Sequence, residues 1–293
     1  MMNDSLTNYM NELLSQRAKR TELLLADRGW LALAGLFWLQ EGENSLGADS
    51  DNAVVLTGAG IPAHAGLIEF RRKARLDELW LRVAPEVRMT QNGTPVTELQ
   101  LDHDMSAQPT FVTLGALTLL LLKRGERYAI RLFDIDSPAR QSFVGLDWYP
   151  IDPALRIEAQ YEPHDPPRVL VIDNVVGDVS ESINPGAVYF TLAGQECRLE
   201  AEARGSKLFF NFRDLTNHDT TYPAGRFLYA DVSVRQKVTL DFNQATNPYC
   251  AYTPFAPVRC RQPKIGCRCG LNQGRNGMGK LKTKNCCKVA YAH

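Results

Sequence analysis

The residues best suited to chemistry lie between positions 220 and 250. In the segment TTYPAGRFLYAD, Arg226 follows Gly225, and Tyr222 precedes it by four residues. Arginine holds carboxylate or phosphate groups through two parallel hydrogen bonds, so Arg226 is the predicted anchor of an anionic ligand. The following polar segment, LDFNQATNPYC, supplies four further candidate ligand contacts, which are Asp241, Asn243, Asn247 and Cys250.

Two interpretations of this cluster stay open at the level of sequence. A hairpin of residues 227–229 with 237–241 would bring Arg226 and Asp241 to the same end of a sheet. They would then either face a shared ligand or pair with each other while the asparagines cap turns. Cys250 is either a reactive thiol, for which His218 is the nearest base in kind, or an inert buried cysteine.

A second cluster comprises Asp134, Asp136 and Arg140. Carboxylates two residues apart on a strand share one face and could hold a divalent cation through oxygen ligands. The competing interpretation is a turn, because Asp136 begins an Asp-Ser-Pro sequence that is typical of a helix start. This cluster, together with Asp241, forms the basis of an alternative function as a hydrolase-type enzyme.

The last segment, residues 257–293, differs from the rest in composition. It holds five of the seven cysteines, but their spacing does not fit a zinc site, so no metal is predicted there. Read one frame over with GC-rich codons, residues 257–279 become CPLPPAENRLPLRIEPGKKWD, which resembles ordinary protein. We expect an out-of-frame segment here, and a natural disordered basic tail is the alternative.

Charge and hydrophobicity exclude several broad classes of function. Residues 1–256 hold 24 basic and 33 acidic side chains, and this charge of −9 argues against nucleic-acid binding. The longest apolar runs, residues 31–39 and 114–122, are too short to span a membrane. The polar start lacks the apolar region of a signal peptide, so we expect a cytoplasmic protein without a membrane partner.

The apolar periodicity predicts a mainly β protein. Residues 4–27 carry leucines at helical spacing, and short alternating runs separated by Gly, Pro, Asn and Asp follow as far as residue 241. We predict an N-terminal helix (1–28), a β-sandwich (29–124), a second antiparallel β domain (125–256) and the tail (257–293).

Segments 30–49, 220–231 and 240–256, supported by 133–153, resemble a bacterial and archaeal family catalogued as domain of unknown function 1684 (DUF1684). The resemblance runs over about residues 25–256. It implies no settled activity and no known cofactor.

Residues 43–99 are also similar to a forkhead-associated (FHA) domain, a small β-sandwich that binds phosphothreonine. Gly47, His64 and the Asn92-Gly93 pair match that pattern. Ala48 stands where the resemblance implies the phosphate-binding arginine, and Pro62-Ala63 stand where it implies a Ser-Arg pair. We therefore expect an FHA-like sandwich without phosphopeptide binding, in which His64 ties a loop.

The function favoured by the sequence is a β module that binds a small anionic metabolite. Hydrolysis is the second hypothesis, and a protein-interaction module with a protein partner is the third. The expected ligand contacts are Arg226, Tyr222, Asp241, Asn243, Asn247, Cys250, Asp134 and Arg140.

Overall fold

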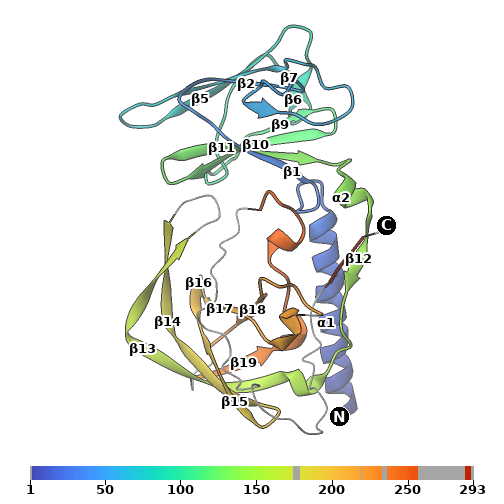
Figure 1. The fold of residues 1–293 in the computed structure, drawn as a ribbon, viewed down its shortest axis with the longest axis vertical. Helices are drawn as coiled ribbons and strands as arrows, with labels where there is room; N and C mark the ends of the chain where they lie inside the picture. The colour runs from blue at the N-terminus through green and yellow to red at the C-terminus, as the bar shows by residue number, and fades with distance from the viewer. Residues whose placement is uncertain (1, 174–178, 219, 233–235, 257–287, 292–293) are drawn as a thin grey trace. The chain divides into compact units, whose positions relative to one another are not determined.

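The computed structural model describes residues 2–173, 179–218, 220–232, 236–256 and 288–291 (Figure 1). They divide into two compact units. The sandwich unit comprises residues 22–142, and the C-terminal unit comprises residues 1–21 and 143–293. The mainly β fold predicted from the sequence is confirmed. The segment expected to be out of frame lies outside the described residues, apart from the backbone of the short strand β20 (Lys288–Tyr291).

The first element is the helix α1 (Met2–Leu25), close to the predicted range. Leu13 and Leu24, which are eleven residues apart and therefore on one helical face, are both buried. The chain leaves the helix at Gly29, where a Cβ atom would lie 2.4 Å from the carbonyl oxygen of Leu24. Among the described helices, none combines the length and the apolar composition that crossing a lipid bilayer requires.

The sandwich unit consists of two β-sheets. The first has the strand order β1 (Leu33–Trp38), β11 (Arg127–Asp134), β10 (Leu117–Arg124), β9 (Phe111–Leu114), β6 (Met89–Gln91) and β7 (Thr94–Val96). The second has the order β3 (Val54–Val55), β2 (Gly42–Gly47), β4 (Gly66–Arg71), β5 (Glu78–Val83) and β8 (Glu98–Gln100). Neighbouring strands are antiparallel except β2 and β3.

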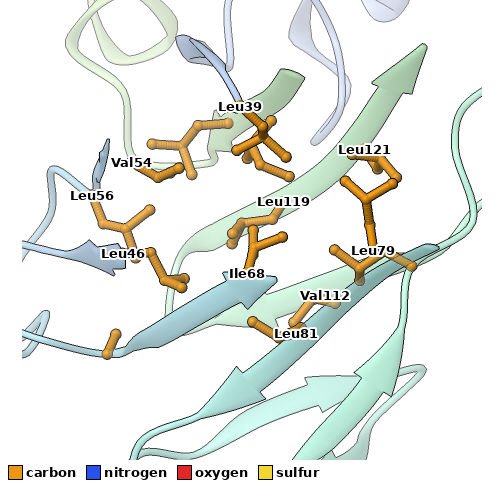
Figure 2. Packing of buried hydrophobic residues seen from close by; sticks show 14 of the residues in the cluster. Leu39, Leu46, Val54, Leu56, Ile68, Leu79, Leu81, Val112, Leu119 and Leu121 are labelled. Atoms are coloured by element: carbon orange, nitrogen blue, oxygen red, sulfur yellow. The ribbon is translucent and has the colours of Figure 1, made fainter. Parts of the chain in front are cut away.

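The core of the sandwich lies between these two sheets (Figure 2). Ile68 and Leu81 come from the second sheet, and Leu119 and Leu121 come from the first. The intervening Leu120 and Leu122 point to the other face of β10, where they join a smaller apolar cluster with Phe133. The unbroken leucine run is therefore explained by a strand that is buried on both faces.

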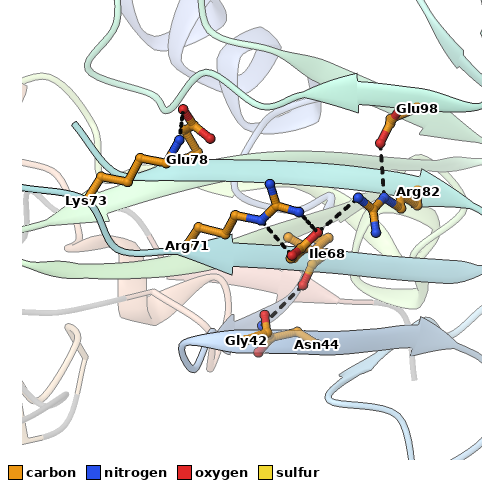
Figure 3. Close-up of polar contacts among 9 residues, drawn as sticks. Gly42, Asn44, Ile68, Arg71, Lys73, Glu78, Arg82 and Glu98 are labelled. Carbon is orange, nitrogen blue, oxygen red and sulfur yellow. Dashed lines mark hydrogen bonds and ion pairs between the residues drawn. The ribbon is translucent and has the colours of Figure 1, made fainter.

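The second sheet carries charged side chains in opposite-charge pairs along β4, β5 and β8 (Figure 3). Glu69 accepts hydrogen bonds from Arg71 at 2.6 and 2.8 Å and pairs with Arg82 at 3.1 Å. Arg82 also bonds to Glu98 at 3.0 Å. The hydrogen bond from Arg71 is the main reason that the pKa of Glu69 is lowered. Pairs of this kind keep a partly exposed sheet face soluble and in register.

The boundary between the two units differs from the predicted one at residues 124 and 125. Strand β11 pairs with both β10 and β1, so it is an interior strand of the first sheet. The short helix α2 (Pro138–Gln141) follows, and the division falls between Ser142 and Phe143. The helix α1 also does not stand apart, because its residues 2–21 group with the C-terminal unit.

The C-terminal unit contains three antiparallel sheets, which confirms the predicted strand direction. One has the order β15 (Gln195–Glu200), β14 (Val179–Leu192), β13 (Arg156–Asp173) and β19 (Lys237–Asp241). The second has the order β16 (Glu202–Arg204), β17 (Lys207–Phe212) and β18 (Arg226–Ala230). In the third, β12 (Phe143–Asp147) pairs with β20. The short helices are η1 (Pro153–Leu155), η2 (Leu215–His218), η3 (Phe242–Gln244) and η4 (Tyr249–Ala251).

Strands β13 and β14 continue past prolines. Pro163, Pro166, Pro167 and Pro185 are typical of strand ends, because proline lacks the N–H that a β ladder uses. Figure 1 shows β13 and β14 as one long hairpin, with an irregular register between Pro163 and Arg168. The prolines suggested breaks, but a bulge absorbs them within the ladder.

The close approach of two loops in the sandwich depends on Gly47. A Cβ atom at this position would lie 2.0 Å from the Ala63 carbonyl oxygen. We expect Gly47→Ala to lower the free energy of unfolding by about 1–3 kcal/mol, because backbone must move to admit the methyl group. Urea unfolding followed by circular dichroism checks this.

The matched control is Gly58→Ala, at an exposed loop position where the nearest atom to an added Cβ is 3.4 Å away. This variant should stay within about 0.5 kcal/mol of the parent. Equal effects of the two substitutions would show that the approach at Gly47 is not a constraint.

Candidate functional site

Arg226 begins strand β18, and its side chain is among the most deeply buried in the protein, at 1% exposure. Its guanidinium donates a hydrogen bond to Asp214 Oδ2 and lies over the Phe212 ring at 4.7 Å. The acceptor of this bond is therefore Asp214, which the sequence analysis did not single out. A buried ion pair of this kind resists disruption, because removing one partner leaves an unbalanced charge.

The predicted hairpin of residues 227–229 with 237–241 is wrong. Strand β18 forms its ladder with β17, and β19 forms its ladder with β13. One isolated bridge joins Val232, which follows β18, to Val238 of β19. The predicted geometry failed because a short connection between two strands does not require them to pair, and each found a partner elsewhere.

Asp214 orders the loop that precedes Arg226. Its Oδ1 atom accepts a hydrogen bond from the backbone N–H of Thr216 at 2.9 Å. Its own backbone N–H donates to Asn217 Oδ1 at 2.7 Å. The hydroxyl groups of Thr216 and Thr221 lie 2.9 Å apart. Through these bonds, the buried Arg226–Asp214 pair is linked to Thr216, Asn217 and Thr221.

Tyr222 connects this loop to the segment around Cys250. Its hydroxyl donates a hydrogen bond to Cys250 Sγ at 3.3 Å, and the cysteine is partly buried. The His218 side chain lies outside the described part of the structure. A role for Cys250 as a reactive thiol or as a ligand contact stays a prediction.

Asp241, Asn243 and Asn247 are buried, and the first two bond to each other at the start of η3. Asp241 caps η3, where its Oδ1 atom accepts hydrogen bonds from Asn243 N at 3.1 Å and Asn243 Nδ2 at 3.0 Å. The Asn243 side chain also bonds to the backbone N–H and carbonyl of Asp152, each at 2.9 Å. These bonds of Asn243 match the turn-capping interpretation, and the role of Asn247 stays a prediction.

Tyr9 joins the N-terminal helix to this cap. Its hydroxyl lies 3.1 and 3.0 Å from the two carboxylate oxygens of Asp241. Burial, followed by the negative charge of Asp241, raises the pKa of Tyr9 to about 12. The phenol therefore stays protonated and serves as a hydrogen-bond donor that anchors α1.

The second predicted cluster, in the sandwich unit, forms a turn and a helix start. Asp134 Oδ1 accepts the backbone N–H of Asp136 at 2.8 Å, and Ser137 caps α2. Arg140 donates to the carbonyl oxygens of Leu25 and Ile135 and pairs with Asp27 at 2.8 Å. These contacts explain the cluster without a ligand, although binding by Asp134 and Arg140 stays untested.

Among the described residues, Asp49, Asp51 and His64 are the group whose ligand atoms lie close enough for a metal ion, all within 4.8 Å. All three side chains are exposed. His64 Nδ1 lies 3.3 Å from Asn52 Oδ1, which ties the two loops together as expected. Exposed acidic groups of this kind are common without a metal.

Cationic and aromatic side chains gather around the exposed Tyr229 in the C-terminal unit, and we call this set the Tyr229 surface. On β18, Arg226, Leu228 and Ala230 are buried on one face, so Tyr229 points to the opposite face. Tyr229 is 51% exposed and Tyr249 is 37% exposed. The set consists of Arg20, Arg204, Phe209, Tyr229 and Tyr249.

The printed ring contacts of the Tyr229 surface form two groups, Arg20 with Tyr249 and Arg204 with Phe209 and Tyr229. The Arg20 guanidinium lies over the Tyr249 ring at 5.3 Å, and the Arg204 guanidinium lies over the Phe209 ring at 5.4 Å. Phe209 and Tyr229 are directly paired across β17 and β18, with ring centroids 5.0 Å apart. Burial raises the pKa of the Tyr229 phenol, Tyr249 adds to this effect, and both arginines oppose it.

Arg20, Tyr229 and Asp214 are not among the residues predicted from the sequence. The alternation of residues 226–230 predicts that Tyr229 lies on the face opposite Arg226, so Tyr229 could have been identified from the sequence. The approach of Arg20 from α1 and the pairing of Asp214 depend on tertiary contacts that no local pattern reveals.

The Tyr9 contact generates a pH-dependent prediction. We expect Tyr9→Phe to lose about 1–3 kcal/mol of unfolding free energy at pH 8, since it removes a donor to a buried carboxylate. Because the folded-state pKa of Tyr9 is raised above that of the unfolded chain, its contribution is complete below pH 10 and declines toward pH 12.

The difference between the parent and Tyr9→Phe should therefore shrink as urea unfolding is repeated from pH 8 to pH 11. Tyr189→Phe, which removes a partly exposed phenol from β14, is the control for the substitution itself. A difference that did not change with pH would contradict this assignment.

Similarity to known proteins is found over parts of this chain. No curated protein matches the chain. An uncharacterized protein of Haloarcula marismortui, solved by NMR, is 25% identical, with 51% of this chain and 75% of that chain covered and a TM-score of 0.33.

Two FHA domains are also similar to this chain. The FhaA FHA domain, solved with the intracellular domain of Rv3910, is 20% identical, with 33% of this chain and 96% of that chain covered and a TM-score of 0.23. An FHA domain studied for phosphothreonine-dependent interactions is 19% identical, with coverages of 33% and 92% and a TM-score of 0.23. Similarity at this level carries no conclusion about function.

The family comparison concerns the second half of the chain. The matched part includes the motifs at 220–231 and 240–256 and excludes the segment at 30–49. The resemblance drawn from the sequence is confirmed for this part: residues 141–264 match the family described as protein of unknown function (DUF1684).

Proposed function

We propose that the C-terminal unit is a binding module for a small anionic ligand, and that the ligand lies against the Tyr229 surface. The observation that supports this proposal is that the Arg20 guanidinium has an unsatisfied hydrogen-bond donor. Its Nε atom is buried, and among the described residues no acceptor lies within hydrogen-bonding reach of it. Its Nη2 atom has only a long contact, 3.5 Å, with the Asn247 carbonyl oxygen.

An arginine in this state can still bind an anion. Guanidinium groups hold carboxylates and phosphates with two parallel hydrogen bonds, and a buried donor without a partner is costly. An anion beside Arg20 would satisfy that donor. Tyr249 lies under the guanidinium and limits its orientations, which lowers the entropy that binding would otherwise cost.

Arg226, the anchor predicted from the sequence, has a different role in this proposal. An anion that approached it would compete with the Asp214 carboxylate already in place, and its side chain leaves β18 on the face away from Tyr229. We assign Arg226 to positioning. It orders the loop that carries Tyr222, and Tyr222 in turn contacts Cys250, the neighbour of Tyr249.

The test is native mass spectrometry of the purified protein, combined with identification of small molecules released on denaturation. We expect a bound anion that is lost in Arg20→Gln, because the substitution removes the charge and the paired donors. Lys19→Gln, an exposed neighbour on α1, is the matched control and should retain the ligand.

A ligand retained in Arg20→Gln would refute the site. A purified protein with no bound species, and no gain in melting temperature with added phosphate or acetate, would refute the function.

A further inference from the structure

The Tyr229 surface exposes aromatic rings that its own unit only partly covers. Phe209, which is buried, packs against Tyr229 at 5.0 Å and against the partly buried Phe227 at 4.9 Å, so two aromatic rings support Tyr229. This support holds the Tyr229 ring in place while leaving half of the side chain open. A supported, half-open ring is a platform on which another flat ring can stack.

The charges around this platform select the sign of a ligand. Arg20 and Arg204 flank the rings, and Glu202 is the acidic group whose charge also reaches Tyr229. Glu202 is already engaged, because it accepts hydrogen bonds from Arg204 at 3.0 Å and from Ser182 at 3.1 Å. The remaining positive charge is that of Arg20, which disfavours a cationic ligand on the aromatic rings.

A buried acceptor atom also lies on this face of the sheet, and it is not a contact for the anionic group of a ligand. Asn211 follows Phe209 by two residues on β17, so its side chain is on the same face of the sheet. Its Oδ1 atom is buried, and within the described residues it has no hydrogen-bond partner. Buried polar atoms in this state are uncommon and are typically satisfied by water or by a ligand donor.

These observations separate three ligand classes. A neutral apolar ligand would cover the rings but leave the donors of Arg20 without a charged partner. An inorganic anion would satisfy Arg20 but leave the supported Tyr229 ring exposed. A planar ring that carries an anionic group would use both features at once.

We propose that the Tyr229 surface binds an aromatic anion, with its ring stacked on Tyr229 and its carboxylate or phosphate held by Arg20. This inference rests on the proposed function and narrows its ligand class. Tyr249 orients Arg20, and Phe209 supports the stacking ring from below.

The experiment is a calorimetric titration of the full-length protein with three matched probes. They are 2-naphthoate, its saturated analogue decahydro-2-naphthoate and the neutral 2-naphthamide. We expect 2-naphthoate to bind at least about tenfold more tightly than either analogue, because each analogue loses the stacking or the charge.

Substitutions test whether Tyr229 and Arg20 form the binding site. Tyr229→Ala should weaken 2-naphthoate binding about tenfold, and Tyr229→Phe should retain it, because the ring and not the hydroxyl forms the platform. Arg20→Gln should remove the preference for naphthoate over naphthamide, whereas Lys19→Gln should leave all three affinities unchanged. Circular dichroism and melting temperature establish that each variant is folded.

The outcomes distinguish this inference from the proposed function. Equal binding of naphthoate and its saturated analogue, with dependence on Arg20, would overturn the aromatic class and keep the anion site. Absence of naphthoate binding would also overturn the aromatic class, while the co-purifying anion decides the broader function. Binding that is unaffected by both Tyr229→Ala and Arg20→Gln would place the ligand elsewhere and refute the inference.

Discussion

The buried pair of Arg226 and Asp214 is the interaction on which the C-terminal unit depends. Arg226 enters the apolar interior over the Phe212 ring, where an unpaired guanidinium would be very costly. Asp214 balances that charge and in the same position caps the loop that leads to Tyr222. The Asp214 carboxylate therefore stabilises both the buried arginine and the loop, so a substitution at Asp214 affects both.

Because Asp214 neutralises the charge of Arg226 within the protein, an anion is expected to bind at another arginine. The buried charge is taken up by the protein, whereas Arg20 reaches the same unit from α1 with part of its guanidinium unsatisfied. The contact of Tyr9 with Asp241 holds this helix against the unit and therefore fixes the position of Arg20. The candidate site is thus assembled from segments that are about 200 residues apart in sequence.

Local sequence patterns predicted most helices and strands but few of the contacts between them. Alternation located β18, and helical spacing located α1, because burial on one face leaves a period in the sequence. The pairing of β18 with β17 and the Arg226–Asp214 contact left no comparable signal, since many strands and acids are equivalent by local chemistry. The cluster at Asp134 and Arg140 shows the reverse case, in which residues that suggested a site form a turn.

A double-mutant cycle of Arg226→Met and Asp214→Leu tests the central claim most directly. Urea unfolding of the parent, both single variants and the double variant gives the coupling free energy between the two side chains. If the pair neutralises itself within the fold, each single variant loses several kcal/mol of unfolding free energy. The loss in the double variant is then smaller than the sum of the two single losses by about 1–3 kcal/mol. Additive losses would show that Arg226 is not balanced by Asp214 and would return it to consideration as a ligand anchor.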